Sequence, residues 1–277
     1  MSITRKTARR FISALTEECK RTMKHLKVPG YPRTYYLSYL LRDIHTTEIW
    51  GRLGEINYAS DQDSRNMYCD VRVGSYRYDQ VSEGGLSGGE SEGEAYDHVE
   101  MPIGNDVDAL KFHVWRLTEA RYREAVRDYL RRKSDHITFV DPNKSLASFR
   151  KAEPNEDLRF TPFKKVDTAA WRDFVKRSSR VVKGHPEVKN SWVEVRIRQT
   201  TRMFVSSEGV RLVDQSQVCE LSCTLWLLTD GGEGLDCRIT HTTPDLTELP
   251  DLRTFNRAIR DRIKLLKELS QAPSLKS

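Results

Sequence analysis

Two separated stretches of the chain alternate apolar residues with polar or aromatic ones, and this period of two constrains the fold more than any other feature. The first stretch spans Met67–Val73 and the second spans Cys219–Leu227. Residues at i, i+2 and i+4 of a β-strand line one face, so both stretches predict half-buried strands. The same pattern, or a short apolar run between turn residues, predicts further strands at Tyr35–Leu41, Ile49–Tyr58, 192–197, Met203–Val205, Val210–Val213 and Leu235–Ile239.

Helical patterns stand at the ends of these strand groups. Helices are expected at about Arg5–Lys27, at about Asp106–Lys133, from an Asp167 cap to near Gly184, and from an Asp251 cap onward. The helices do not alternate singly with the strands. The order therefore predicts an α+β fold of mostly antiparallel sheets with flanking helices, and not a doubly wound fold.

Each half of the chain has the order helix, strand meander, helix, which suggests a duplication. We expect one domain over residues 1–277, with sub-halves at about 1–135 and 160–270 and a linker that contains Pro142, Pro154 and Pro162. Turns are expected at 59–66 ("ASDQDSRN") and around His45 and His241, each beside a Thr-Thr pair. Residues 83–94, rich in glycine, serine and glutamate, read as an acidic loop.

The composition is that of a globular chain with a highly charged surface. Hydrophobic residues make up 38% and charged residues 31%, and no run reaches the roughly 18 apolar residues of a membrane helix. Arg9-Arg10-Phe11 resembles part of a twin-arginine signal, but the apolar stretch after it ends at Glu17 and Glu18. The five cysteines are odd in number and scattered, which indicates a reducing compartment. We therefore expect a cytoplasmic protein.

The net charge of +6 and the pI of about 9.0 permit contact with nucleic acid. The candidate segment is Arg116–Lys133, in which arginines recur at near-helical spacing. Acidic residues are interleaved with them, at Glu119, Glu124 and Asp128. The sequence favours a solvated helix face with internal ion pairs over a phosphate-binding stripe.

The stretch Met203–Asp214 ("MFVSSEGVRLVD") contains two adjacent serines, so we ask whether one of them is a catalytic nucleophile. Its two apolar runs read as strands, and Ser206–Gly209 between them read as the hairpin loop, with Gly209 in the left-handed conformation. A catalytic serine also needs a base, and no histidine is near in sequence. A turn is the favoured interpretation.

Other matches to catalytic motifs lack the required context. Gly85–Gly89 fits G-x-S-x-G but has no strand before it and no helix after it. His98-Val99-Glu100 fits the H-x-E of zinc deaminases, but the partner P-C-x-x-C is absent. Cys219, Cys223 and Cys237 lie on the apolar phase of their strands and read as buried thiols. The residues thus indicate no catalytic and no metal-binding position, and the binding residues stay unknown.

Five segments in order resemble the N-terminal half of TldD/PmbA-type metallopeptidases. They are Gly30–Asp43, Asp70–Val81, Pro102–Ala125, Phe139–Asn143 and Phe204–Gln215. The resemblance implies a second half with a zinc site, formed by a His-Glu-x-x-x-His helix and a cysteine. It also implies cleavage of unfolded peptides, homodimers or heterodimers, and links to antibacterial-peptide maturation and to modulation of DNA gyrase.

The zinc motif of that second half does not occur in this chain, and no family site residue maps onto it. We therefore expect a non-catalytic half that contributes dimerisation and unfolded-peptide recognition. Zinc is expected only on a missing C-terminal half or on a partner chain of the same type, and this chain is expected to be inactive alone. The alternatives are a basic module that contacts nucleic acid and an inactive remnant of the family.

Overall fold

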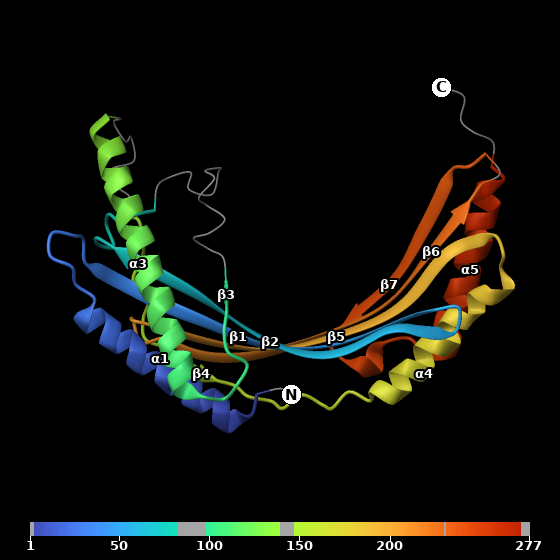
Figure 1. Cartoon of the computed structure of the whole chain (residues 1–277), viewed down its shortest axis with the longest axis horizontal. Helices are drawn as coiled ribbons and strands as arrows, with labels where there is room; N and C mark the ends of the chain where they lie inside the picture. The colour runs from blue at the N-terminus through green and yellow to red at the C-terminus, as the bar shows by residue number, and fades with distance from the viewer. Residues whose placement is uncertain (1–2, 82–97, 139–146, 230, 273–277) are drawn as a thin grey trace.

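A computed structural model describes residues 3–81, 98–138, 147–229 and 231–272. The described residues form one curved seven-stranded sheet with helices packed at its two ends (Figure 1). The strands follow the order β3-β2-β1-β5-β6-β4, and β7 also pairs with β6. The helices are α1 (Arg5–His25), α3 (Val107–Thr138), α4 (Thr168–Ser179) and α5 (Leu252–Ser270), with short 3₁₀ turns at Arg180–Gly184 and Leu246–Glu248.

Four long strands form the middle of the sheet. They are β1 (Thr34–Arg52), β2 (Glu55–Val73), β5 (Val188–Ser206) and β6 (Arg211–Leu228), and β7 (Gly234–Thr243) extends one end. The hairpins β1–β2 and β5–β6 meet where β1 pairs with β5, antiparallel like their other pairings. Two short strands complete the sheet: β3 (Val99–Glu100) pairs antiparallel with β2, and β4 (Glu156–Leu158) pairs parallel with β6. The predicted α+β class, mostly antiparallel with flanking helices, is confirmed.

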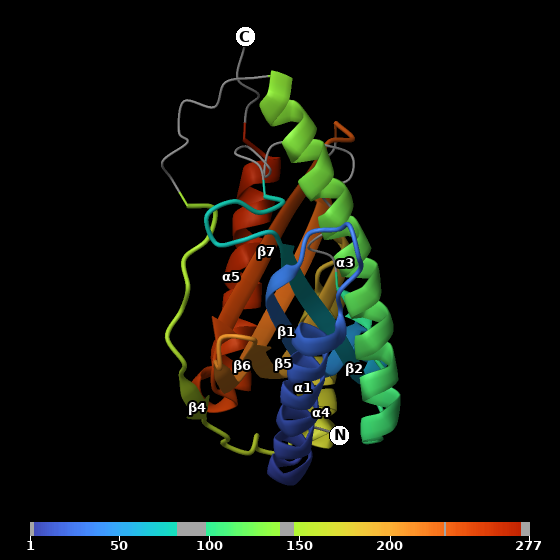
Figure 2. The ribbon, with the colours of Figure 1, turned by 90° about the vertical axis from the view of Figure 1, so that its left-hand side faces the viewer.

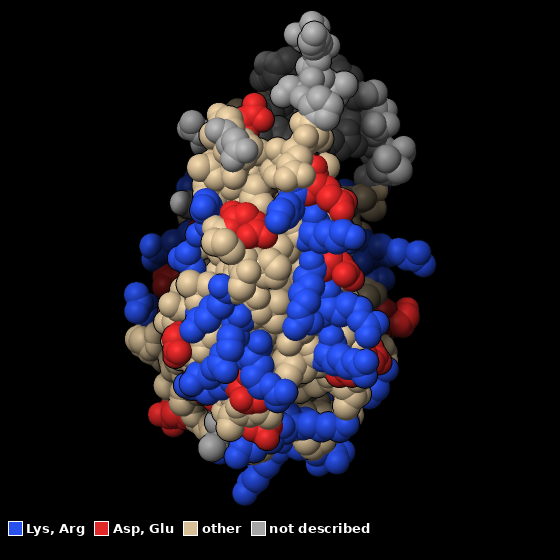
Figure 3. Space-filling view, turned by 90° about the vertical axis from the view of Figure 1, so that its right-hand side faces the viewer, with Lys and Arg blue, Asp and Glu red and all other residues tan. Residues whose placement is uncertain are grey.

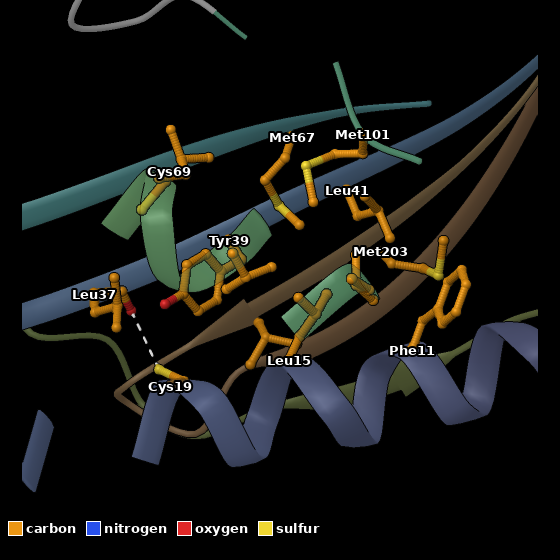
Figure 4. Close-up of a cluster of buried hydrophobic side chains, with 14 of the residues drawn as sticks. Phe11, Leu15, Cys19, Leu37, Tyr39, Leu41, Met67, Cys69, Met101 and Met203 are labelled. Carbon is orange, nitrogen blue, oxygen red and sulfur yellow. Dashed lines mark hydrogen bonds between the residues drawn. The ribbon is translucent and has the colours of Figure 1, made fainter. Parts of the chain in front are cut away.

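The first hydrophobic core lies between the sheet and the helices α1 and α3. Figure 4 shows Phe11, Leu15 and Cys19 of α1 pointing toward Tyr39 and neighbouring strand residues. The Tyr39 hydroxyl would be costly to bury alone, and it forms a 2.7 Å hydrogen bond with the Thr118 hydroxyl of α3. The core is therefore closed by two helices that are about a hundred residues apart in the sequence.

The second core lies at the opposite end of the same side of the sheet. Phe255, Ile259 and Ile263 of α5 are buried there, and Val175 of α4 joins them. Each core uses strands from both halves of the sequence: Leu41 pairs with Met203 in the first core, and Ile49 pairs with Val195 in the second. Both helix–strand–helix runs are present in order, but their strands share one sheet.

Two expected turns are wrong, because residues 42–48 and 59–66 continue β1 and β2 as paired strands. Polar side chains are stable there because they bond to one another between the two cores. His45 lies between Asp63 (Nδ1 to Oδ1, 2.8 Å) and Asp61 (Nε2 to Oδ1, 3.0 Å), and Asp61 also accepts a hydrogen bond from Thr47. His241, also expected in a turn, lies within β7.

The segment before α4 supplies hydrogen-bond partners to other polar side chains in the same middle part of the sheet. The backbone N–H of Thr161 donates to Gln215 (2.6 Å), and the carbonyl of Lys164 accepts from Gln199 (3.1 Å). Residues 161–164, which have no regular structure, thus provide partners for the side-chain amides of Gln199 and Gln215. This explains how a row of polar side chains can lie in the sheet between the two cores.

The local signals at element ends are confirmed. Asp167 accepts from the backbone N–H groups of Ala169 and Ala170, and Asp251 accepts from that of Thr254 at 2.7 Å. No described helix is long and apolar enough to span a membrane. The expected acidic loop at 83–94 and Pro142 lie outside the described residues.

The true turn between β1 and β2 contains Leu53 and Gly54, both with positive φ (51° and 82°). Positive φ at both central residues is the pattern of a type I′ hairpin turn, which favours Asn-Gly. Leucine pays a steric penalty in this conformation, and Leu53 is exposed. We expect Leu53→Asn to raise the free energy of unfolding by about 0.5–1 kcal/mol, measured by urea denaturation. Leu53→Val, which is β-branched, should lower it; the opposite order would contradict this turn geometry.

Candidate functional site

The Ser206–Gly209 loop is a structural turn. The Ser206 N–H donates to the Val210 carbonyl (3.0 Å), and Gly209 has φ +88°. The Ser207 hydroxyl oxygen accepts from the Leu37 N–H at 3.0 Å, which ties the turn to β1. These bonds confirm the interpretation of Met203–Asp214 as a hairpin.

Glu208 of the same loop fixes neighbouring segments. Its carboxylate accepts from the Tyr76 hydroxyl (2.8 Å) and from the Ala152 N–H (3.1 Å). Burial, together with this carboxylate, raises the pKa of Tyr76 to about 12. The side chain therefore holds two loops onto the turn.

The cysteines are packed as predicted for core residues. Cys219 and Cys223 are buried and Cys237 is half-buried. Burial raises the pKa of Cys223 to about 12 and that of Cys219 to about 11. Among the described residues, no three His, Cys, Asp or Glu side chains form a group that could hold a metal ion.

The raised thiol pKa values predict a labelling pattern. Burial raises the pKa of Cys223 well above pH 8, so its thiol is protonated there, and the thiolate is the form that reacts. We expect iodoacetamide to label Cys237 in the folded chain and to leave Cys19 and Cys223 unmodified, with all five labelled in 6 M guanidinium. Peptide mass spectrometry measures this. Rapid labelling of Cys223 in the folded chain would contradict its buried position.

The remaining motif candidates do not converge. His98 lies beside the Tyr68 ring, 5.6 Å between centroids, and Glu100 pairs with Asn66 in the sheet. The Gly85–Gly89 motif lies outside the described residues. The arginines of α3 face solvent and acidic neighbours: Arg123 contacts Glu119 (2.7 Å), and Arg131 approaches Asp128 (3.7 Å). This confirms the ion-paired face predicted for that helix.

One edge of the sheet, at residues 55–62 of β2, is unpaired among the described strands. β3 pairs only with Asn66 and Met67, and the Met101 N–H donates to the Arg65 carbonyl at 2.8 Å. Backbone groups of alternate strand residues point to the same side, so those of Ala59, Asp61 and Asp63 point outward as those of Arg65 do. The edge is exposed: the Asp61 side chain is 59% accessible. We call residues 55–62 the open edge.

An aromatic pair lies beside the open edge on the side of the sheet opposite the helices. Trp50 and Tyr58 stack with ring centroids 6.3 Å apart, and Tyr58 is 38% exposed. Strand alternation places both on the face opposite Ile49, which belongs to the second core. Figure 1 shows α1, α4 and α5 on the convex side of the sheet. This pair offers an apolar contact surface beside the outward backbone groups of Ala59 and Asp61.

Ion pairs across strands give the same face its polar character. Arg196 of β5 contacts Glu194 (2.8 Å) and reaches Glu48 of β1 (3.2 Å). On the neighbouring strands Arg238 contacts Glu220 at 2.8 Å. Burial raises the pKa of Glu194, and Arg196 opposes that shift. The face is thus an ordered charged surface that also carries aromatic rings.

Sequence patterns did not indicate the open edge. Residues 59–66 contain Ser, Asp, Gln and Asn, which are typical of turns, so the strand there was missed. β2 lies outside β1 in the sheet because β1, and not β2, pairs with β5. Trp50 and Tyr58 were placed on one strand from sequence, whereas they are cross-strand neighbours.

Neither a protein-family model nor a curated protein matches the sequence. Similar folds are found among solved structures. A protein of Thermotoga maritima, described as a proposed modulator of a DNA gyrase, matches with 9% identity and a TM-score of 0.50, over 90% of this chain and 48% of its own. A Bacteroides thetaiotaomicron protein of the same description matches with 8% identity and a TM-score of 0.51, over 91% and 49%.

TldE of Thermococcus kodakarensis has 13% identity and a TM-score of 0.48, over 91% of this chain and 47% of its own. The chain thus spans about half the length of the solved structures it matches. The two gyrase-modulator structures confirm, at the level of fold, the TldD/PmbA resemblance that the five sequence segments indicated.

Proposed function

We propose that this chain is the non-catalytic, peptide-recognising half of a TldD/PmbA-like peptidase system. Unfolded peptides pair with the open edge of β2, and hydrolysis takes place at a zinc site on another segment or a partner chain. The observation that carries the proposal is the exposed, unpaired edge beside the Trp50–Tyr58 pair. The likeness in fold supports the choice of system.

Strand addition explains selectivity for unfolded chains. An extended peptide hydrogen-bonds through its backbone to the outward N–H and C=O groups of Ala59 and Asp61. A folded protein has no free backbone of this length, so it does not pair. Alternate side chains of the peptide would face Trp50 and Tyr58, which favours aromatic or aliphatic residues at those positions.

Hydrogen exchange tests the proposed edge residue by residue. On addition of an extended ten-residue peptide rich in valine and threonine, we expect the amides of Ala59 and Asp61 to become protected. The amides of Ser60, Gln62 and Ser64 point toward β1 and should change little. Methylating alternate backbone nitrogens on the pairing side of the peptide should abolish binding. Methylation of the other set should leave it. Protection at β7 instead, or equal binding of both methylated peptides, would contradict the proposal.

A matched pair of variants isolates the backbone group at residue 59. Ala59→Pro removes one outward N–H, and proline is tolerated at strand edges. We expect about tenfold weaker peptide binding, the effect of one hydrogen bond near 1.4 kcal/mol. Ala59→Ser keeps the N–H and should bind as the parent chain does. Fluorescence anisotropy measures both, and equal affinities would exclude pairing at this residue.

The proposal also includes assembly with a chain of the same type, as a homo- or hetero-oligomer. We expect peptide hydrolysis only when a zinc-bearing TldD/PmbA-like chain is added, with loss on chelation. Zinc-dependent hydrolysis by this chain alone would contradict a non-catalytic role.

A further inference from the structure

A dense group of cations covers the outer surface of α4 and α5. Figure 3 shows Lys and Arg side chains clustered on the end of the molecule where these helices lie, and Figure 2 views the ribbon from the opposite end. Helix α5 carries six Lys or Arg against two acidic residues, and residues 168–184 carry five against one. We call these eleven cations the basic face: Arg172, Lys176, Arg177, Arg180, Lys183, Arg253, Arg257, Arg260, Arg262, Lys264 and Lys267.

Few cations of the basic face form close ion pairs, although Asp251 lies near Arg253 and Arg257 and Glu187 lies near Lys267. Within the described residues, only Arg177 with Asp173 (3.3 Å) and Lys264 with Glu268 (3.8 Å) form ion pairs there. Both pairs are solvent-exposed, and such pairs contribute little. On α3, by contrast, the exposed Arg123 and Arg131 each have an acidic neighbour on the same helix. Unneutralised like charges repel, so a surface of this kind is stabilised by an anionic partner.

The spacing along α5 gives the cations a fixed geometry. Arg253, Arg257, Arg260, Lys264 and Lys267 follow one another at intervals of four, three, four and three, so they lie on one side of the helix. All are exposed, and the opposite side of α5 is buried against the sheet. At 1.5 Å per residue the stripe is about 21 Å long, and duplex DNA carries about a dozen charges over that length.

The chemistry of the surface indicates a polynucleotide backbone and not a membrane. A helix that binds in a membrane interface inserts its apolar side, but the apolar side of α5 forms the second core through Phe255, Ile259 and Ile263. Arginine is the majority cation and fits phosphate oxygens in a bidentate manner. The stripe itself has no aromatic residue for stacking on unpaired bases.

From these observations we propose that the basic face of α4 and α5 binds the phosphate backbone of double-stranded nucleic acid without sequence preference. This site is separate from the open edge of β2 and does not depend on peptide recognition there. The sequence alone indicated Arg116–Lys133, on α3, as the candidate segment for nucleic acid. The site proposed here lies on α4 and α5 instead.

Fluorescence anisotropy with a labelled 25-base-pair DNA duplex tests this site. We compare the parent chain with Arg253→Gln/Arg257→Gln/Arg260→Gln. The matched control, Arg116→Gln/Arg123→Gln/Arg127→Gln, removes three exposed arginines from α3 and changes the net charge equally. All six positions are exposed, so both variants should fold, which circular dichroism and thermal melting verify.

We expect the α5 variant to bind duplex at least tenfold more weakly at 100 mM salt. The slope of log K against log salt should fall by about 2–3, since each neutralised phosphate contributes about 0.9. The α3 control should keep the parent affinity within about twofold. Equal losses in the two variants would reduce the effect to net charge and overturn the site. No duplex binding at 50 mM salt would do the same, and so would tighter binding to polyglutamate or to anionic vesicles than to duplex.

Discussion

Phe255→Ala is expected to lower the free energy of unfolding by about 3–5 kcal/mol, because it opens a cavity in the second core. The ring is fully buried, and it contacts Phe174 of α4 (5.9 Å between centroids) and His241 of β7 (6.1 Å). Three elements therefore lose contacts at once, and the backbone of α5 cannot close the space without leaving the sheet. Urea denaturation followed by circular dichroism measures the loss.

The control for this prediction is Phe112→Ala on α3. Phe112 is 53% exposed, so its truncation should change the free energy of unfolding by less than about 1 kcal/mol. Hydrogen exchange adds a spatial readout, because α5 and β7 should lose protection before α1 does. Equal destabilisation by the two alanine variants would contradict the assigned core.

Asp79→Ala is the second change with a large expected effect. The Asp79 side chain is fully buried, and its carboxylate accepts from the Tyr35 hydroxyl (2.7 Å) and lies near Arg72 (3.3 Å) and Arg132 (3.4 Å). Removing the carboxylate takes the counter-charge from Arg132 and leaves Arg72 with Asp70 as its remaining acidic partner (3.0 Å), and the Tyr35 hydroxyl loses its acceptor. Breaking a buried pair in this way costs about 3–5 kcal/mol.

Asp79 also connects segments that are distant in the sequence, through both its carboxylate and its backbone carbonyl. Arg132 of α3 donates to the Asp79 carbonyl (2.8 Å), and the Tyr35 hydroxyl is held so that burial and Asp79 raise its pKa. We expect Asp79→Ala to lower the urea midpoint strongly. Asp173→Ala should have almost no effect, because both Asp173 and its partner Arg177 are about 60% exposed. A loss below about 1 kcal/mol for Asp79→Ala would show that the network is not needed for stability.

Features that depend on neighbours along the chain could be predicted from the amino-acid order. The caps at Asp167 and Asp251, the left-handed Gly209 and the buried phase of Cys219–Leu227 were all predicted correctly. Each results from a few adjacent residues, through side-chain hydrogen bonds to free backbone groups or through strand alternation. The fold class follows from the order of these elements.

Features that depend on contacts across the sheet became visible in the folded chain alone. Residues 59–66 resemble a turn by composition, and they form a strand because His45 and Thr47 of β1 bond to their aspartates. The open edge exists because β1, and not β2, pairs with β5. The basic face joins two helices more than seventy residues apart, since both pack on one core. Local sequence could not predict these sites because the partners that create them are distant along the chain.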